Sequence, residues 1–430
     1  MPAACIAVRV RIQTSQLAEQ AVETSHTPSP FDPVRIGPLG LRNRFIKSAT
    51  NEGMAPGGMV TQALVRHHRR MAAGGAAMTT VAYCAVSADG RTFPDQVLLE
   101  PGSVAGLRVL TDAVHAEGAA ACAQITHGGA FTFLPELCTR YPLSSSGGFN
   151  PPGVLSSRFF KTAMTEADMD QVAGEFVRGA KLAREAGFDA VEIHMGHGYL
   201  LSQFLSPMYN KRKDRYGGDA AARVEFPAQV LRRVLDAVGG EMAVTCKIGV
   251  TEGTKKGGTA EDAAVIAQRL EREGAHLLVL SGGMNVEAPW AIFGSHMPRE
   301  ATETVQNPIV RFASRLQALA QPKIEFRQMY LLEHSRKVRA AVKMPLGYLG
   351  GAKSLAAIRE ALGEGFDCIV MGRALIHDPQ LVNQFRDGKA TESGCTACNR
   401  CIAQMYTPGG TGCVLQEPND PALNRLPAAG

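Results

Sequence analysis

Short apolar runs alternate with longer helical patterns from Arg44 to Asp387, and this alternation constrains the fold more than any other feature of the chain. Repeated units of one strand and one helix are typical of a parallel sheet. Eight runs are candidate strands: Phe45–Ser48, Met78–Cys84, Ala119–Gln124, Ala190–His194, Ala243–Gly249, Leu277–Gly282, Pro345–Leu349 and Cys368–Met371.

Helical patterns lie between and after these strands, and several end near a glycine that can cap a helix C-terminus. We expect helices at Ala63–Ala72, Val104–Ala116, Glu166–Glu185, Ala220–Val238, Ala260–Glu273, Leu331–Val342, Leu355–Leu362 and Leu381–Arg386. Eight such units predict an α/β fold, a single (β/α)8 TIM barrel. An open doubly wound sheet is the alternative, but no GxGxxG opens the first strand-to-helix turn.

The length of 430 residues fits one barrel with appendages. We expect a barrel over 31–390, a C-terminal Cys-rich segment over 391–430 and a disordered extension over 1–30. Arg9 and Arg11 interrupt the apolar stretch near the N-terminus, which argues against a secretory signal. Glu19 and Glu23 argue against an organelle transit peptide.

The net charge of +5 is small, and no run of Lys and Arg marks a nucleic-acid surface. No stretch reaches the roughly 18 apolar residues of a membrane span. Four of the ten cysteines crowd between Cys395 and Cys413, unlike an evenly spread disulfide framework. We therefore expect a cytoplasmic protein with a small-molecule substrate, without nucleic-acid or membrane partners, and leave a homo-oligomer open.

Two long connections, Thr126–Thr165 and Gly283–Gln328, follow the third and sixth candidate strands. In a barrel of this kind the loops after the strands carry the active site, so these connections either shape a substrate pocket or are surface padding. Gly350 and Gly351, with Gly372 and Arg373, end the last two strands and predict a phosphate site. Two ordinary tight turns are the alternative.

The segment Val191–Gly218 is the most informative in the chain and reads VEIHMGHGYLLSQFLSPMYNKRKDRYGG. It resembles the old yellow enzyme family, whose pattern is E-I-H-x-x-[HN]-G-Y-L-x-x-Q-F-L-S-P-x-x-N-x-R-x-D-x-Y-G-G. FDPVRIGPLGLRNRF, QITHGG, LGG and MGRALIHDP extend the resemblance over roughly residues 31–387. The resemblance implies an FMN-dependent oxidoreductase that uses NADH or NADPH.

For catalysis, the resemblance implies that His194 and His197 hydrogen-bond an electron-withdrawing oxygen of the substrate, which stabilises charge as hydride arrives. Tyr199 would donate a proton to the carbon that becomes a carbanion. Tyr83 matches a position where trimethylamine dehydrogenase, a family member, has an aromatic substrate residue; a simple strand-end aromatic is the alternative.

For the cofactor, the resemblance implies that Gln124 binds the flavin pyrimidine edge, that the segment from Ser48 to Asn51 runs along the ring, and that the phosphate meets the glycines and arginine named above. This set comprises Ser48, Ala49, Thr50, Asn51, Gln124, Lys247, Gly350, Gly351, Gly372 and Arg373. Two residues depart from the family. Lys247 stands where Arg is usual and keeps the positive charge. Asn51 stands where Thr or Cys commonly tunes the flavin potential.

Cys395, Cys398, Cys401 and Cys413 form C-x2-C-x2-C-x11-C, a spacing that suits a four-iron, four-sulfur cluster or a tetrahedral zinc. This segment resembles the cluster-binding segments of trimethylamine dehydrogenase and bacterial 2,4-dienoyl-CoA reductase. A [4Fe-4S] cluster here would either exchange electrons with a separate protein or hold the end of the barrel together. Free thiols remain an alternative.

Three functions follow. The leading hypothesis is an ene-reductase-like enzyme, in which NAD(P)H drives the reduction of an electron-poor C=C bond such as an enone. The second is an amine-type dehydrogenase or demethylase that passes electrons through the cluster to an electron-transfer protein. The third is a partner-binding barrel without flavin chemistry, for which Asn51 and Lys247 are the only support.

Overall fold

Eight parallel strands close into one barrel in the computed structural model, which describes residues 27–298, 321–322, 324–406 and 409–416. The strands meet in the order β10-β11-β12-β13-β3-β4-β5-β9. Their bounds are Phe45–Lys47 (β3), Met78–Ala85 (β4), Ala120–Thr126 (β5), Ala190–Met195 (β9), Ala243–Gly249 (β10), Leu277–Ser281 (β11), Leu346–Tyr348 (β12) and Cys368–Met371 (β13). The predicted (β/α)8 barrel is confirmed.

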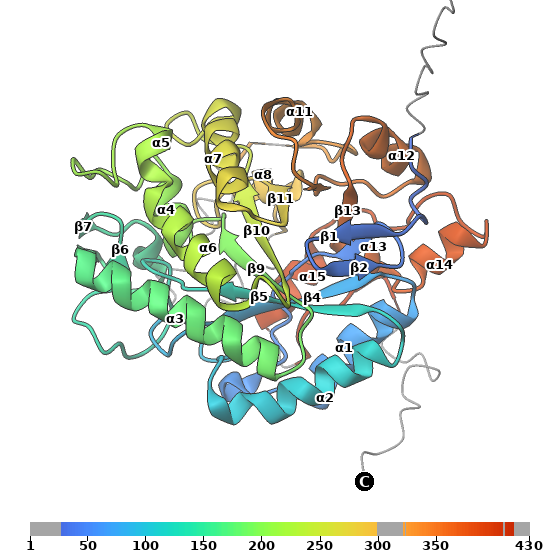
Figure 1. Cartoon of the computed structure of the whole chain (residues 1–430), viewed down its shortest axis with the longest axis horizontal. Coiled ribbons are helices and arrows are strands. Elements are labelled where there is room, and N and C mark those ends of the chain that lie inside the picture. The colour runs from blue at the N-terminus through green and yellow to red at the C-terminus, as the bar shows by residue number, and fades with distance from the viewer. Residues whose placement is uncertain (1–26, 299–320, 323, 407–408, 417–430) are drawn as a thin grey trace, which may run out of the picture.

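Helices surround the strands (Figure 1), and several begin at a side chain that caps the first turn. Thr61, Thr165, Thr259 and Ser354 each accept a hydrogen bond from the backbone N–H three residues later. The main helices are Gln62–Ala73 (α1), Val104–His115 (α2), Glu166–Glu185 (α3), Glu225–Val238 (α6), Ala260–Glu273 (α7), Leu332–Ala341 (α11), Leu355–Gly363 (α12) and Leu381–Arg386 (α14).

The prediction of one continuous helix over 220–238 was wrong. The structure has a short helix, Ala220–Arg223 (α5), and then α6, with Val224 between them. Pro227 lies in the first turn of α6 and has no N–H to donate to the carbonyl of Arg223. The helix is therefore interrupted one turn before the proline.

A hairpin of two strands, Val34–Ile36 (β1) and Leu39–Leu41 (β2), closes the N-terminal end of the barrel. Ile36 and Leu41 are buried and pack in one cluster with strand residues such as Met78 and Leu277. Because side chains fill this end, a cavity is available at the opposite end, where the strands terminate.

The two long connections contain structure of their own. The first holds a small sheet of Leu143–Ser144 (β6), Gly148–Phe149 (β7) and Phe160–Ala163 (β8), in the order β6-β8-β7. The second begins with the short helix Pro289–Phe293 (α8). Neither connection could be assigned elements from periodicity, because strands of two to four residues carry too few positions to show a pattern.

The C-terminal segment packs onto the open end of the barrel. Lys353 Nζ donates to the carbonyl of Cys395 at 3.2 Å, and Thr411 N–H donates to the carbonyl of Glu52 at 2.7 Å. A short helix, Arg400–Ala403 (α15), lies between these contacts and has Cys401 and Ile402 buried. The Cys-rich segment therefore forms part of the wall at the barrel's C-terminal end.

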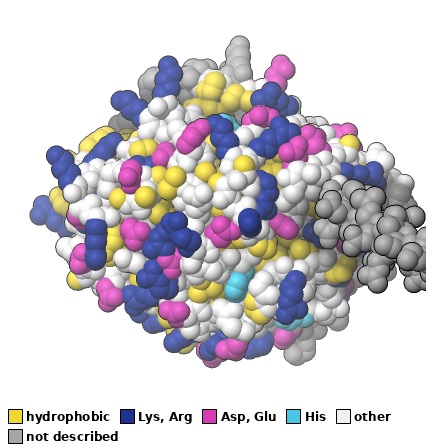
Figure 2. All heavy atoms as spheres, turned by 45° about the horizontal axis from the view of Figure 1, so that its top comes forward, with side chains coloured by type: hydrophobic (Ala, Val, Ile, Leu, Met, Phe, Trp, Pro, Cys, Tyr) yellow, Lys and Arg dark blue, Asp and Glu magenta, His cyan; other side chains and the backbone are white. Residues whose placement is uncertain are grey.

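Basic and acidic side chains are interspersed on the face shown in Figure 2. Among the residues that the structure describes, no helix combines the length and the apolar character needed to cross a membrane. The predicted extension over 1–30 falls almost wholly outside the described residues, which begin at Thr27.

Candidate active site

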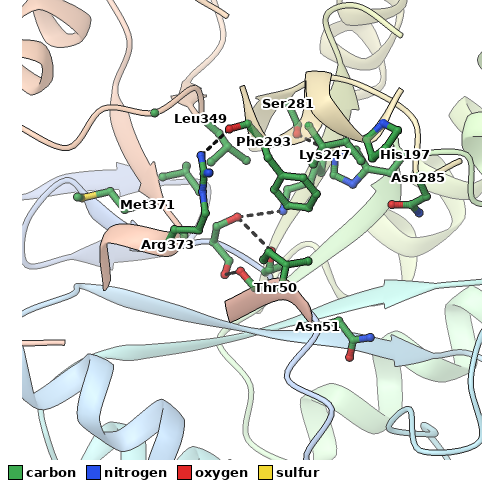
Figure 3. A pocket seen from close by; sticks show the side chains of 18 of the residues that line it. Thr50, Asn51, His197, Lys247, Ser281, Asn285, Phe293, Leu349, Met371 and Arg373 are labelled. Atoms are coloured by element: carbon green, nitrogen blue, oxygen red, sulfur yellow. Dashed lines mark hydrogen bonds between the residues drawn. The ribbon is translucent and has the colours of Figure 1, made fainter. Parts of the chain in front are cut away.

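A cavity of about 310 Å³ opens at the C-terminal end of the barrel. Its wall brings together most of the residues that the sequence predicted for cofactor and substrate, some of which Figure 3 shows from close by. These are Ser48, Ala49, Thr50, Asn51, Tyr83, Gln124, His194, His197, Tyr199, Lys247, Gly351, Gly372 and Arg373. Residues from seven of the eight strands or the loops after them thus converge on one space.

Four other predicted residues do not line this cavity: Gly350, Cys398, Cys401 and Cys413. Gly350 instead accepts hydrogen bonds at its carbonyl, from Tyr330 N–H at 3.0 Å and from the Tyr348 hydroxyl at 3.2 Å. A Cβ at Gly350 would lie 2.3 Å from that hydroxyl, so close packing requires the glycine.

His194, near the end of β9, is buried beside His197, with 5.0 Å between the ring centroids. Its Nδ1 accepts a hydrogen bond from the backbone N–H of Gly196 at 3.2 Å. Burial, then His197 and Lys247, hold the pKa of His194 well below its usual range. The ring is therefore neutral with its proton on Nε2, which makes that atom a donor.

His197 follows β9 and adopts a left-handed backbone conformation, with φ at 62°. Its Nε2 lies 2.8 Å from the hydroxyl of Ser281, at the end of β11. Burial, and secondly Lys247, lower the pKa of His197 to about 3. The backbone N–H of Asn285 donates to the carbonyl of His197 at 3.2 Å, which ties the loop after β11 to this histidine.

Tyr199 is buried and packs against His194 and Tyr83, at 4.7 Å and 5.1 Å between ring centroids. The Tyr83 hydroxyl lies 2.7 Å from Thr92 Oγ1. Burial raises the pKa of Tyr83 well above its usual value, and Tyr199 raises it further. Tyr83 is thus in direct contact with the predicted proton donor.

Lys247, on β10, lies at the floor of the cavity with its side chain almost wholly buried. Its Nζ lies 3.0 Å from the Glu192 carboxylate and donates to Ser48 Oγ at 3.5 Å. Gln124 Nε2 donates to the same carboxylate at 2.7 Å. Glu192 therefore orients both predicted ligands of the flavin pyrimidine edge, a role that the sequence reading missed.

A second buried ion pair lies beside the segment from Ser48 to Asn51. Lys47 Nζ donates to the Glu52 carboxylate at 2.7 Å, and this carboxylate also accepts from the backbone N–H of Ala82 at 3.0 Å. Burial lowers the pKa of Lys47 against the opposing effect of Glu52. The pair was not predicted, although a lysine inside an apolar strand was a signal for it.

Arg373 turns its guanidinium toward the C-terminal segment and the loop after β11. It donates to Asn399 Oδ1 at 2.6 Å, to the Phe293 carbonyl at 2.6 Å and to Ser295 Oγ at 3.0 Å. All the hydrogen-bond acceptors of Arg373 within the described part of the chain are neutral, so its charge is not balanced by a carboxylate there. A guanidinium in this state at a cavity wall suits an anionic ligand.

Aromatic side chains form much of the remaining wall, and the sequence reading did not identify them. They are Phe93, Phe131, Phe293, Phe326 and Tyr330. Phe131 packs against Tyr199 at 5.7 Å between ring centroids. These residues come from connections without regular periodicity, so only the folded chain shows that they face one space.

The four clustered cysteines are all described and none is in a disulfide. Cys395 lines the cavity, and Cys413 Sγ lies 3.3 Å from Nδ1 of His377. Within the described segments, no three side chains of His, Cys, Asp or Glu are arranged to hold a metal ion. The metal site at these cysteines therefore stays a prediction.

Known proteins resemble the chain over most of its length. It is 43% identical over 400 residues to the 4,4'-dithiodibutanoate disulfide reductase of Rhodococcus erythropolis, covering 92% of this chain and 96% of the relative. It is 30% identical over 390 residues to the metal reductase of Desulforamulus reducens, covering 90% of this chain but 53% of that relative. The chain thus matches nearly all of the first relative and about half of the second.

Solved structures share the fold. A 2-naphthoyl-CoA reductase complex matches with a TM-score of 0.76 at 22% identity, covering 91% of this chain and 57% of the other. Morphinone reductase matches with a TM-score of 0.66 at 21% identity, covering 85% and 92%. The model of the NADH:flavin oxidoreductase / NADH oxidase family matches residues 29–392. The chain is therefore an oxidoreductase and belongs to the NADH:flavin oxidoreductase / NADH oxidase family.

Proposed function

We propose that the protein is an FMN-dependent reductase in which NADH or NADPH supplies electrons for an electron-poor C=C bond, such as that of an enone. The convergence of His194, His197 and Tyr199 on one buried cavity carries this proposal. Two neutral histidines and a tyrosine can polarise an acceptor oxygen and protonate a carbon. Membership of an oxidoreductase family argues against the third hypothesis, a partner-binding barrel without flavin chemistry.

The residues at the cavity wall fit FMN. Gln124 and Lys247 offer polar atoms at one side, where Glu192 holds them, and Arg373 offers an unbalanced positive charge at another. We infer that these residues, with Ser48 to Asn51, Gly351 and Gly372, hold the cofactor, while Gly350 supports them by packing. FMN bound there would supply hydride transfer from the nicotinamide to the acceptor.

The protein groups then act on the acceptor. His194 Nε2–H donates to its electron-withdrawing oxygen, and His197 lies beside this position. Both rings are neutral because burial lowers their pKa values, so they stabilise developing charge as hydrogen-bond donors and not as acids. Tyr199 donates the proton to carbon. Tyr83, whose hydroxyl is held by Thr92, orients Tyr199.

Disulfide reduction is a second candidate, because the 43% identical relative is a disulfide reductase. The two reactions differ in product: NAD(P)H and a proton convert one disulfide to two thiols, or one C=C bond to C–C. Anaerobic stopped-flow of the flavin against NADH and NADPH, then against enones, nitroalkenes, 4,4'-dithiodibutanoate and amines, tests both. Fastest reoxidation by an enone supports the first proposal. Fast reoxidation by the disulfide alone, with release of thiols, overturns it in favour of the second.

The outward flow of electrons from an amine is a third candidate, favoured by Cys395 in the cavity wall beside the other three cysteines. Such a flow would need a cluster and a separate electron-transfer protein. A homo-oligomer and a cytoplasmic location likewise stay proposals, the latter from the cysteine content.

Anaerobic purification should yield about four iron and about four acid-labile sulfide per chain if the cysteines bind a [4Fe-4S] cluster. Cys398→Ser should then lose most of this iron, because each thiolate is a ligand. Cys138→Ser is the matched control, since Cys138 is an exposed cysteine in the first long connection, outside the cysteine cluster. Zinc without iron would remove the electron-relay proposal.

Asn51→Ala should lower the two-electron reduction potential of the bound flavin by roughly 10 to 30 mV, the equivalent of one neutral hydrogen bond. The Asn51 Oδ1 atom accepts the backbone N–H of Gly53 at 3.2 Å, which leaves the Nδ2 donor available at the cavity wall. A dye-coupled redox titration measures the potential, and Asn51→Thr should recover it. An unchanged potential in Asn51→Ala would show that this amide does not bind the flavin.

A further inference from the structure

Ser281 ends β11, is 2% exposed and lines the cavity beside His197. Its hydroxyl oxygen lies 2.8 Å from His197 Nε2. Within the part of the chain that the structure describes, this is the only hydrogen bond of the Ser281 hydroxyl. The neighbouring backbone is fixed as well, because the Ser281 carbonyl accepts Val250 N–H at 2.7 Å.

Two proton arrangements fit this contact. In the first, the Ser281 O–H donates to Nε2, and the single ring proton of neutral His197 resides on Nδ1. In the second, Nε2–H donates to the serine oxygen, which leaves the serine O–H buried without an acceptor. A buried unpaired donor is destabilising, so the first arrangement is the stable one.

His194 has the opposite tautomer. Its Nδ1 accepts the N–H of Gly196 at 3.2 Å, so its proton is on Nε2. We propose that Ser281 is a positioning residue that locks His197 as the Nδ1–H tautomer, so that the pair offers one donor from each ring to a single acceptor atom. The need for two donors follows from the proposed function, whereas the tautomer itself can be measured without turnover.

Loss of the Ser281 hydroxyl removes the group that sets the tautomer. His197 can then place its proton on Nε2 and turn a lone pair on Nδ1 toward the cavity. Such a ring repels an acceptor oxygen where the wild-type ring donates to it. Ser281 thus contributes to substrate polarisation without touching the substrate.

The first test is the long-range proton–nitrogen NMR spectrum of holoenzyme labelled with 15N-histidine, in which a His197→Asn variant identifies the His197 signals. Wild type and Ser281→Thr should show the Nδ1–H pattern, and Ser281→Ala should lose it. An Nε2–H pattern in wild type overturns the proposal, and this holds even if Ser281→Ala fails to retain FMN. An Nδ1–H pattern retained in Ser281→Ala also overturns it.

The second test is the affinity of oxidised holoenzyme for 4-chlorophenol, whose oxygen is the probe acceptor, followed by the flavin absorbance. Ser281→Ala should weaken binding about fivefold to tenfold, as loss of one hydrogen bond does, and Ser281→Thr should restore it. Ser335→Ala, at a buried serine on α11, is the matched control. Equal binding of 4-chlorophenol by Ser281→Ala and wild type contradicts the proposal. Because this test involves no enone reduction, its result can be interpreted even if the protein does not reduce enones.

Discussion

Tyr199→Phe should slow the reduction of an enone by about 10²-fold or more while leaving the reduction of bound flavin by NAD(P)H within about twofold. The tyrosine is buried in the cavity against His194 and Tyr83, and its hydroxyl is the proposed donor of the proton to carbon. Phe keeps the ring contacts and removes only the hydroxyl. The two half-reactions, measured separately by anaerobic stopped-flow, give the comparison.

Tyr141→Phe is the matched control, because Tyr141 lies in the first long connection outside the residues that line the cavity. It should behave as wild type in both half-reactions. Equal losses in both half-reactions of Tyr199→Phe would instead show that the tyrosine supports the cofactor site as a whole. Reoxidation by a disulfide need not depend on Tyr199 to the same degree, because sulfur leaves as a thiolate and needs no proton at carbon.

His194→Leu should slow reoxidation of the reduced flavin by an enone by about 10² to 10³-fold, the usual cost of removing one donor to a developing oxyanion. The proposed donor is His194 Nε2, because the other ring nitrogen, Nδ1, accepts the N–H of Gly196. Rapid mixing of prereduced enzyme with enone measures the rate constant. His194→Asn, which keeps an N–H donor, should recover part of it.

His334→Ala, on helix α11, is the control and should reoxidise its flavin with enone at the wild-type rate. The pH profile adds an independent check. Because the pKa of His197 is lowered to about 3, this ring gains no proton between about pH 5 and 8, and burial also holds the pKa of His194 well below its usual value. If the rate of flavin reoxidation by enone instead changes with pH around an inflection near 6.5, at least one of the two rings titrates there. The assignment of both rings as neutral donors would then be wrong.

Much of the barrel could be predicted from the sequence because each unit is locally encoded. All eight candidate strands are found within a few residues of their predicted bounds, and α3, α7 and α14 have the predicted bounds. The helix break at Val224, which the prediction missed, has a local cause that is visible in the sequence. Pro227 lacks the backbone N–H that a continuous helix needs at that position. The prediction followed the helical periodicity alone and therefore did not include the break.

The site residues likewise divide into those that were predicted from the sequence and those that only the structure shows. His194, Gln124 and Lys247 were predicted from the resemblance to the old yellow enzyme family, and all three line the cavity. Their partners were not predictable, since Glu192, Glu52 and Ser281 act through contacts between different strands. Ser281, whose hydroxyl lies 2.8 Å from His197 Nε2, is 84 positions away in the chain.

The sequence by itself therefore determined the eightfold architecture and the identity of the central histidines and tyrosine, because periodicity and motif spacing are local properties of the chain. Only the tertiary structure decided that Cys395 and Arg373 both line the cavity and that Glu192 holds Gln124 and Lys247 together. It also decided that Ser281 faces His197. These contacts arise when distant strands and loops close around one cavity, and no local pattern records them.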